Sequence, residues 1–185
     1  MKTFMTAIFA LILAVPAYSN PEAETGAELD LSWQEPEKFT DIRAANDSRS
    51  RFQDRVQRNF EKFFQEMANE LPEGYSWQVT ITDIDLAGEV DYFVTNTGQA
   101  IRVIKEINSP AIRFNHLLRD QYGEEVTGGE ERFRDMGFMS RMSPRGNSPE
   151  FEFERVMLQD WFKKELQPKI TEHAALPAKV SHPER

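Results

Sequence analysis

The sequence predicts an α+β fold, in which two amphipathic helices pack on one face of an antiparallel sheet of three to five strands. Two segments, 48–71 and 152–166, repeat apolar residues at helical spacing. Between them, shorter segments of strand-like composition follow one another through connections of a few residues. Such connections are too short for parallel crossovers, so neighbouring strands should pair antiparallel.

The first nineteen residues have the pattern of a secretory signal peptide. Lys2 supplies the positive start, residues 4–15 form the apolar centre, and Ala17 and Ser19 are the small residues of a cleavage site. The apolar centre is shorter than the roughly 20 residues that span a bilayer. We therefore expect cleavage after Ser19, export of the mature chain and no transmembrane segment in it.

The composition predicts an acidic domain that is stabilised by its apolar core. Loss of residues 1–19 removes a single charge, that of Lys2, and changes the net charge from −9 to −10. Nucleic acid is therefore not expected as a partner, because its recognition needs a basic surface. The absence of cysteine excludes disulfides and cysteine metal sites, and no cofactor is expected. Fourteen phenylalanines and three tryptophans can supply the core.

The chain is expected to fold as one domain, residues 31–167, between two less ordered ends. Residues 20–30 combine Pro, Gly and four acidic residues with few apolar ones, which is typical of a disordered acidic leader. Residues 168–185 contain three prolines and no sustained periodicity, so we expect a loosely ordered tail.

The predicted elements begin with a short strand at residues 31–33, followed by the helix 48–71. Residues 46–48 offer side chains that can cap the start of this helix, and Pro72 and Gly74 end it. The apolar residues of the helix form a single stripe. They are Phe52, Val56, Phe60, Phe63, Phe64, Met67 and Leu71.

The second half of the domain is expected to contain the remaining strands and a terminal helix. Trp77, Val79 and Ile81 alternate with polar residues, which predicts a strand that ends near Asp85. Residues 101–107 and 111–119 predict a hairpin across the turn at 108–110, and a further strand is expected around 132–138. Apolar residues on one half of the segment 152–166 predict a packed helix.

Six blocks of the sequence resemble the proteobacterial domain-of-unknown-function family numbered 3016. They are WQEPEKFTDIR, SRSRF, VTITDIDLAG, IRVIKEI, RDMGF and MLQDWFKKEL, and they extend over nearly the whole predicted domain. The resemblance implies a small exported protein of Gram-negative bacteria, located in the periplasm and with no established activity. Two positions depart from the family pattern: Ala44 stands where a proline usually follows the DIR triplet, and His116 where an aromatic residue, often tyrosine, is expected.

Asp83 and Asp85 are the first candidates for chemistry, since they place two carboxylates on one face of a strand. A paired-carboxylate hydrolase would use one acid protonated and the other ionised. Calcium is not favoured, because Ala87 and Val94 occupy positions of a calcium loop that supply ligands. The structural alternative is a strand end whose acids accept hydrogen bonds from the backbone or from arginine.

His116 is the histidine that lies in a predicted element of the domain. It alternates with Phe114 and Leu118, so we expect it to point toward the helices and to fill an aromatic position. A catalytic role would need a partner that positions the ring, and the sequence shows none.

A basic stripe runs along the first predicted helix. It consists of Arg51, Arg55, Arg58 and Lys62, almost opposite the phenylalanine stripe. Such a stripe can dock to an anionic component of the cell envelope or to an acidic protein. The alternative is a solvated helix face, with Asp54 paired to Arg58 and Glu66 to Lys62.

Three functions are compatible with these observations. The first hypothesis is a non-enzymatic periplasmic domain that binds or scaffolds a partner in the cell envelope, because export and the basic stripe favour it. The second is a periplasmic hydrolase that uses Asp83 and Asp85, with His116 as a further candidate. The third is a carrier of a small apolar ligand, which would need a cavity between the helices and the sheet.

Overall fold

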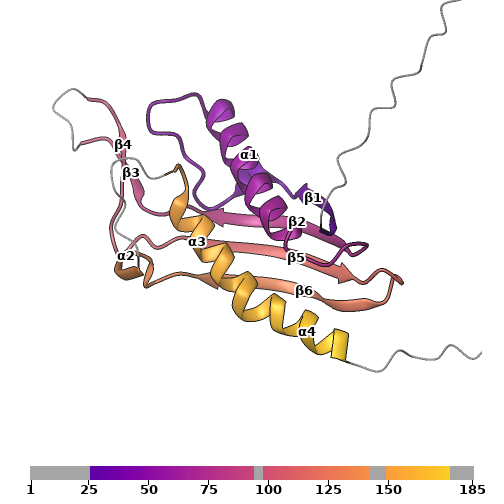
Figure 1. Cartoon of the computed structure of the whole chain (residues 1–185). Coiled ribbons are helices and arrows are strands. Elements are labelled where there is room, and N and C mark those ends of the chain that lie inside the picture. Colours follow the sequence, from indigo (N-terminus) through magenta and orange to yellow (C-terminus); the bar gives the residue numbers. More distant parts are fainter. Residues whose placement is uncertain (1–25, 94–97, 142–148, 176–185) are drawn as a thin grey trace, which may run out of the picture.

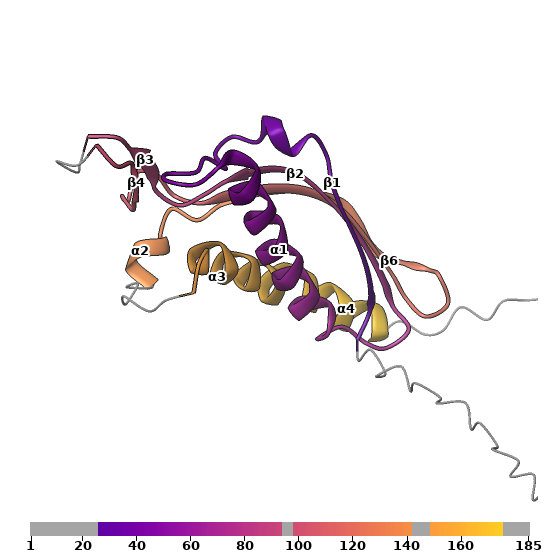
Figure 2. The same ribbon diagram turned by 90° about the horizontal axis from the view of Figure 1, so that it is seen from above.

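The fold is a curved sheet with helices on one of its faces, as seen in the computed structural model, which describes residues 26–93, 98–141 and 149–175 (Figure 1). Figure 2 shows the strands arching around α1, α3 and α4, which all lie on the same side. The predicted α+β class is confirmed. The predicted signal peptide, residues 1–19, lies outside the described residues.

The main sheet has four strands, in the order β1-β2-β5-β6. Their bounds are β1 Glu28–Trp33, β2 Ser76–Asp85, β5 Ala111–Arg119 and β6 Glu125–Arg134. Two short strands, β3 (Glu89–Asp91) and β4 (Ile101–Val103), form a second sheet beyond the end of β2. Three of the four neighbouring pairs in these sheets are antiparallel, and β1 with β2 is parallel.

The parallel pair corrects the expectation that all neighbouring strands pair antiparallel. Glu28 lies beside Ser76 and Trp33 beside Ile81. The chain between β1 and β2 contains the helix α1 (Arg49–Ala68). This helix is long enough to return the chain to the end of the sheet at which β1 begins, so that β2 runs parallel to β1. The first strand also begins at Glu28, inside the segment 20–30 predicted as a disordered leader, because its backbone pairs with β2.

The expected hairpin between residues 101–107 and 111–119 is wrong. Strand β4 pairs with β3, whereas β5 has both of its edges occupied, by β2 on one side and β6 on the other. The last strand was expected around residues 132–138 but spans Glu125–Arg134, so it includes Gly128 and Gly129. A short helix, α2 (Phe138–Arg141), follows it.

The helices follow the predicted apolar stripes. Ser48 caps α1 by accepting a hydrogen bond from the backbone N–H of Arg51, at 3.3 Å. The terminal helix starts with α3 (Glu152–Trp161), widens into a π-type turn at Phe162–Leu166, and continues as α4 (Gln167–Ala175). Residues 168–175 are therefore helical, where a loosely ordered tail was expected. Pro168 has no N–H to donate, and the wider turn ends two residues before it, at Leu166.

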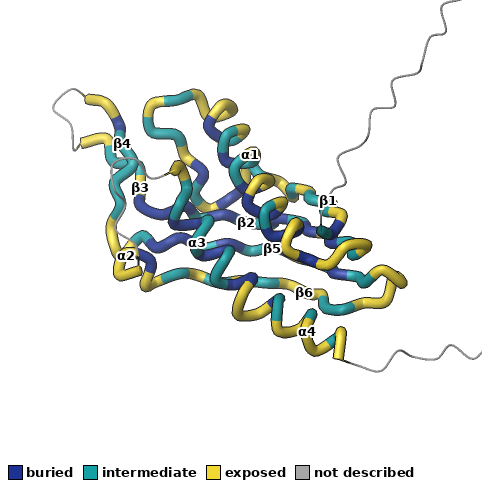
Figure 3. The backbone as a smooth tube through the Cα atoms, in the orientation of Figure 1, coloured by how far each residue is buried: buried dark blue, intermediate teal, exposed yellow. Residues whose placement is uncertain are grey.

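Aromatic rings fill the space between the helices and the inner face of the sheet. Phe64 of α1 packs against Trp77 and Phe114, with ring centroids 5.6 and 5.4 Å apart. Trp161 of α3 also packs against Phe114, with ring centroids 5.0 Å apart. Figure 3 shows the buried residues along the centre of β2 and β5 and on the facing side of the helices. This packing attaches both helical segments to the same two strands.

Arg102 of β4 connects three segments beside the end of the main sheet. Its guanidinium binds the Asp41 carboxylate at 2.9 and 3.3 Å, and each side chain is only 18 % exposed. It also donates to the carbonyl oxygens of Arg43, Ala87 and Gly88, at 3.0, 3.3 and 3.3 Å. Arg102 therefore holds the small sheet against the segment 41–43 and the end of β2.

We expect Arg102→Ala to destabilise the domain by about 2–4 kcal/mol, because it leaves a half-buried carboxylate and three carbonyl groups without their donor. Denaturant unfolding measures this change. The double variant with Asp41→Asn should recover part of the loss, since the unpaired charge is then absent. Additive effects of the two substitutions would show that the pair does not couple these segments.

Candidate functional site

A cleft of about 350 Å³ lies on the face of the sheet that the helices leave open. Both predicted carboxylates, Asp83 and Asp85, line it. They face outward because β2 contains a bulge between Ile81 and Asp83, which shifts the alternation and turns Ile84 into the core. The remaining lining residues come from β5, β6 and the segment before α1. They are Thr40, Ala111, Ile112, Arg113, Arg132, Phe133 and Arg134.

The two carboxylates already have internal partners. Asp83 accepts hydrogen bonds from the backbone N–H and the hydroxyl of Thr40, at 2.7 and 2.8 Å. Asp85 forms an ion pair with Arg134, at 2.6 Å, across the small side chain of Ala111 that separates them in the sheet. These bonds match the structural alternative for strand-end acids, although a cleft adjoins them.

Two arginines in the same cleft have weaker partners. Arg113 and Arg132 lie directly opposite each other on β5 and β6. Arg113 Nε is covered and makes no hydrogen bond with the described residues, and the nearest carboxylate oxygen, from Glu130, is 3.7 Å away. Arg132 is exposed and forms no ion pair within the described part of the chain. The cleft therefore contains two positive groups that are not neutralised in the way Asp83 and Asp85 are.

His116 is buried on the opposite, inner face of the sheet, where the sequence predicted it. Its ring lies 5.6 Å from that of Trp161 and 5.9 Å from that of Phe114. The Trp77 indole N–H donates to Nδ1 at 3.4 Å, and Nε2 lies 3.5 Å from a Glu131 oxygen. Burial lowers the pKa of His116, and the nearby Glu131 carboxylate offsets part of this effect. With 1 % of its side chain exposed, the ring is inaccessible to a substrate.

The basic stripe on α1 is partly neutralised. Arg55 binds Asp47 at 2.7 Å and Glu150 at 3.0 Å, and Arg51 also reaches Asp47, at 3.2 Å. The hydrogen bond from Arg55 lowers the pKa of Asp47. Lys62 lies 3.9 Å from Glu66, as expected for a solvated face.

Arg58 is the exception in the stripe. The expected pair with Asp54 does not form, and Arg58 is exposed without an ion pair to any described residue. The structure thus separates the basic groups into a mostly paired helix face and a less neutralised pair in the cleft of the sheet.

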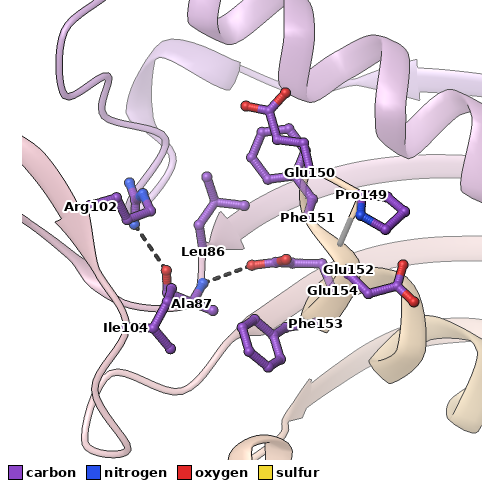
Figure 4. Close-up of a pocket in the computed structure, with 10 residues that line it drawn as sticks. All are labelled: Leu86, Ala87, Arg102, Ile104, Pro149, Glu150, Phe151, Glu152, Phe153 and Glu154. Carbon is purple, nitrogen blue, oxygen red and sulfur yellow. Dashed lines mark hydrogen bonds between the residues drawn. The ribbon is translucent and has the colours of Figure 1, made fainter. Parts of the chain in front are cut away.

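A second cavity, of about 260 Å³, lies between the start of α3 and the ends of β2 and β4 (Figure 4). Its walls are mainly apolar, and Glu154, which is 2 % exposed, is part of them. The Ala87 backbone N–H donates to Glu154 Oε1 at 2.7 Å. Burial raises the pKa of Glu154, although the bond from Ala87 and the charge of Arg102 act in the opposite direction.

Sequence reasoning did not identify Glu154. The sequence does contain an indication of its burial. Glu154 is an acidic residue within the apolar stripe of α3, next to Phe153 and one turn before Met157 and Leu158. An acid at such a position is either paired or protonated. The cavity beside it lies at the end of the sheet, whereas the apolar carrier hypothesis needs one between the helices and the sheet.

Within residues 26–93, 98–141 and 149–175, no three His, Asp or Glu side chains are grouped so that they could hold a metal ion. In the same ranges, no helix has both the length and the apolar character needed to cross a membrane.

One comparison with known proteins gives a match. A family model described as "Protein of unknown function (DUF3016)" matches residues 27–164, which is more than half of the chain. No curated protein and no solved structure matches the chain.

We expect His116→Phe to reduce the loss of stability in mild acid. A histidine whose pKa is lowered in the folded state takes up its proton more readily when unfolded, so stability falls as the pH drops below its ordinary value of 6.5. Melting curves between pH 7 and about pH 5 measure this for both proteins. An unchanged pH dependence in the variant would show that His116 does not titrate differently on folding.

We expect Glu154→Gln to stabilise the domain by about 1–3 kcal/mol at pH 7, because it removes a carboxyl that burial disfavours as an anion. The amide oxygen can still accept from Ala87. A raised pKa in the folded state means that stability is lost as the pH rises above the ordinary value of 4.5, so the gain should shrink toward that pH.

The matched control for this prediction is Glu152→Gln. Glu152 lines the same cavity but pairs with Arg155, so its substitution should give no gain. A Glu154→Gln variant that is less stable than the parent both at pH 7 and near pH 4.5 would show that the ionised carboxylate is required.

Proposed function

The chain belongs to the DUF3016 family of proteins of unknown function, and from this starting point we propose that it is an exported, non-enzymatic domain that binds a cell-envelope partner. The binding surface in this proposal is the open face of the sheet, centred on the cleft between β2, β5 and β6. Export to the periplasm is part of the proposal, and the signal-peptide pattern of residues 1–19 supports it.

The binding role is supported by which charged groups of the cleft have partners within the protein and which do not. Its carboxylates are satisfied by Thr40 and Arg134, whereas Arg113 has a covered Nε without an acceptor and Arg132 is exposed without an ion pair to a described residue. Groups with unused hydrogen-bonding capacity in a concave site are those that a ligand can satisfy. The proposed partner therefore presents negative charge to this face.

A hydrolase that uses Asp83 and Asp85 is the second candidate, because the cleft adjoins both of them. Such a mechanism needs one carboxyl that holds a proton at working pH. Here both carboxylates are already held by other groups of the protein, Asp83 by Thr40 and Asp85 by Arg134. His116 lies on the other face of the sheet from these acids, so it cannot assist them.

The proposal predicts that envelope crosslinking depends on Arg132 and not on Arg58. Both arginines are exposed and lack an ion pair to the described residues, but Arg132 lies in the cleft and Arg58 on α1. We expect Arg132→Glu to lose the crosslinked species seen with the parent protein in living cells, and Arg58→Glu to keep them.

The controls for this experiment are the abundance, the processing after Ser19 and the melting temperature of each variant. Loss of crosslinks in Arg58→Glu alone would move the interface to the helix stripe. Retention of all crosslinks in Arg132→Glu would contradict the proposed binding face. Turnover of a test ester or glycoside that is lost in Asp83→Asn would favour the hydrolase.

A further inference from the structure

We propose that Arg113 and Arg132 together bind a phosphoryl group. This inference rests on the proposed function, since it names the chemistry that the cleft recognises. The starting observation is that two guanidinium groups stand opposite each other on neighbouring strands. Like charges in this position repel and destabilise a sheet unless an anion lies between them.

The contacts around Arg113 show why the site is incomplete without an anion. On one side its strand neighbour is Asp83, but both oxygens of that carboxylate are bound by Thr40. On the other side is Arg132. The Nε group is covered and has no acceptor among the described residues, which is costly for a charged donor.

Glu130 is the nearest competitor for this site. Its carboxylate is 3.7 Å from Arg113 Nε, which is beyond hydrogen-bonding distance, and its side chain is 61 % exposed. An exposed pair of this kind contributes little to stability. A bound anion can therefore displace Glu130 from Arg113 without breaking a strong interaction.

The arrangement favours a phosphoryl group over a carboxylate. One planar guanidinium satisfies both oxygens of a carboxylate, whereas a tetrahedral phosphoryl group has a third oxygen and a larger charge that a second guanidinium can bind. The cleft of about 350 Å³ has room for such a group. The overall net charge of −9 does not oppose this, because screening confines the effect of distant charges.

Calorimetric titration of the full mature protein with inorganic phosphate tests this site, at physiological ionic strength. We expect Arg113→Gln and Arg132→Gln each to weaken binding about tenfold or more, since each removes charge-assisted hydrogen bonds. Arg58→Gln, which changes another exposed arginine, on α1, should bind as the parent does. Phosphate should also raise the melting temperature of the parent but not of Arg132→Gln.

The variant Glu130→Gln tests the phosphoryl site in a way that cannot be confused with unfolding of a variant. It removes the competing carboxylate and should tighten phosphate binding severalfold, which damage to the fold would not do. Weaker or unchanged binding in this variant would overturn the proposed role of Arg113. Absence of phosphate binding and of vesicle binding in the parent protein would overturn the inference as a whole.

A second arm distinguishes free phosphate from a lipid headgroup. Flotation with vesicles that contain phosphatidylglycerol, compared with vesicles of phosphatidylcholine alone, measures binding to an anionic phosphodiester at a surface. Binding that depends on Arg132 in either arm supports the phosphoryl site and identifies its source. If both arms fail while crosslinking in cells still depends on Arg132, this inference is wrong and the proposed binding face remains.

Discussion

The packing of aromatic rings on one face of the sheet is the constraint on which the other elements depend. Trp77 and Phe114 contact rings from both α1 and α3, so the two helical segments are attached to the same pair of central strands. Rings of this size remove about 150–250 Å² each from water. Because the helices pack on this face, the opposite face of the sheet stays open and carries the polar cleft.

The bulge in β2 decides what this open face contains. With regular alternation, Asp83 would follow Ile81 onto the apolar side, and Ile84 would face the solvent. The extra residue, Thr82, reverses the alternation, and its hydroxyl donates to the Arg113 carbonyl oxygen at 3.1 Å. The chemistry of the cleft thus depends on a local irregularity of the backbone.

The sequence was sufficient for the elements that have a strong local pattern. The stripe in α1, the alternation in β2 and β5 and the inward orientation of His116 all follow from periodicity, which depends only on neighbouring residues. The parallel partner of β2 and the pairing of β4 with β3 depend on contacts distant in the chain. Arg113 and Arg132 were missed as a site because they meet only through the register of β5 and β6.

The position of β6 at the edge of the main sheet has a consequence for assembly. Five of its ten residues are charged, and β1 at the other edge carries Glu28 and Asp30. Charged side chains along an edge disfavour the addition of a further strand from another molecule, and thereby protect the chain against aggregation. Neither edge is thus a good template for strand addition, which leaves the side chains of the open face as the surface through which this sheet can meet another molecule.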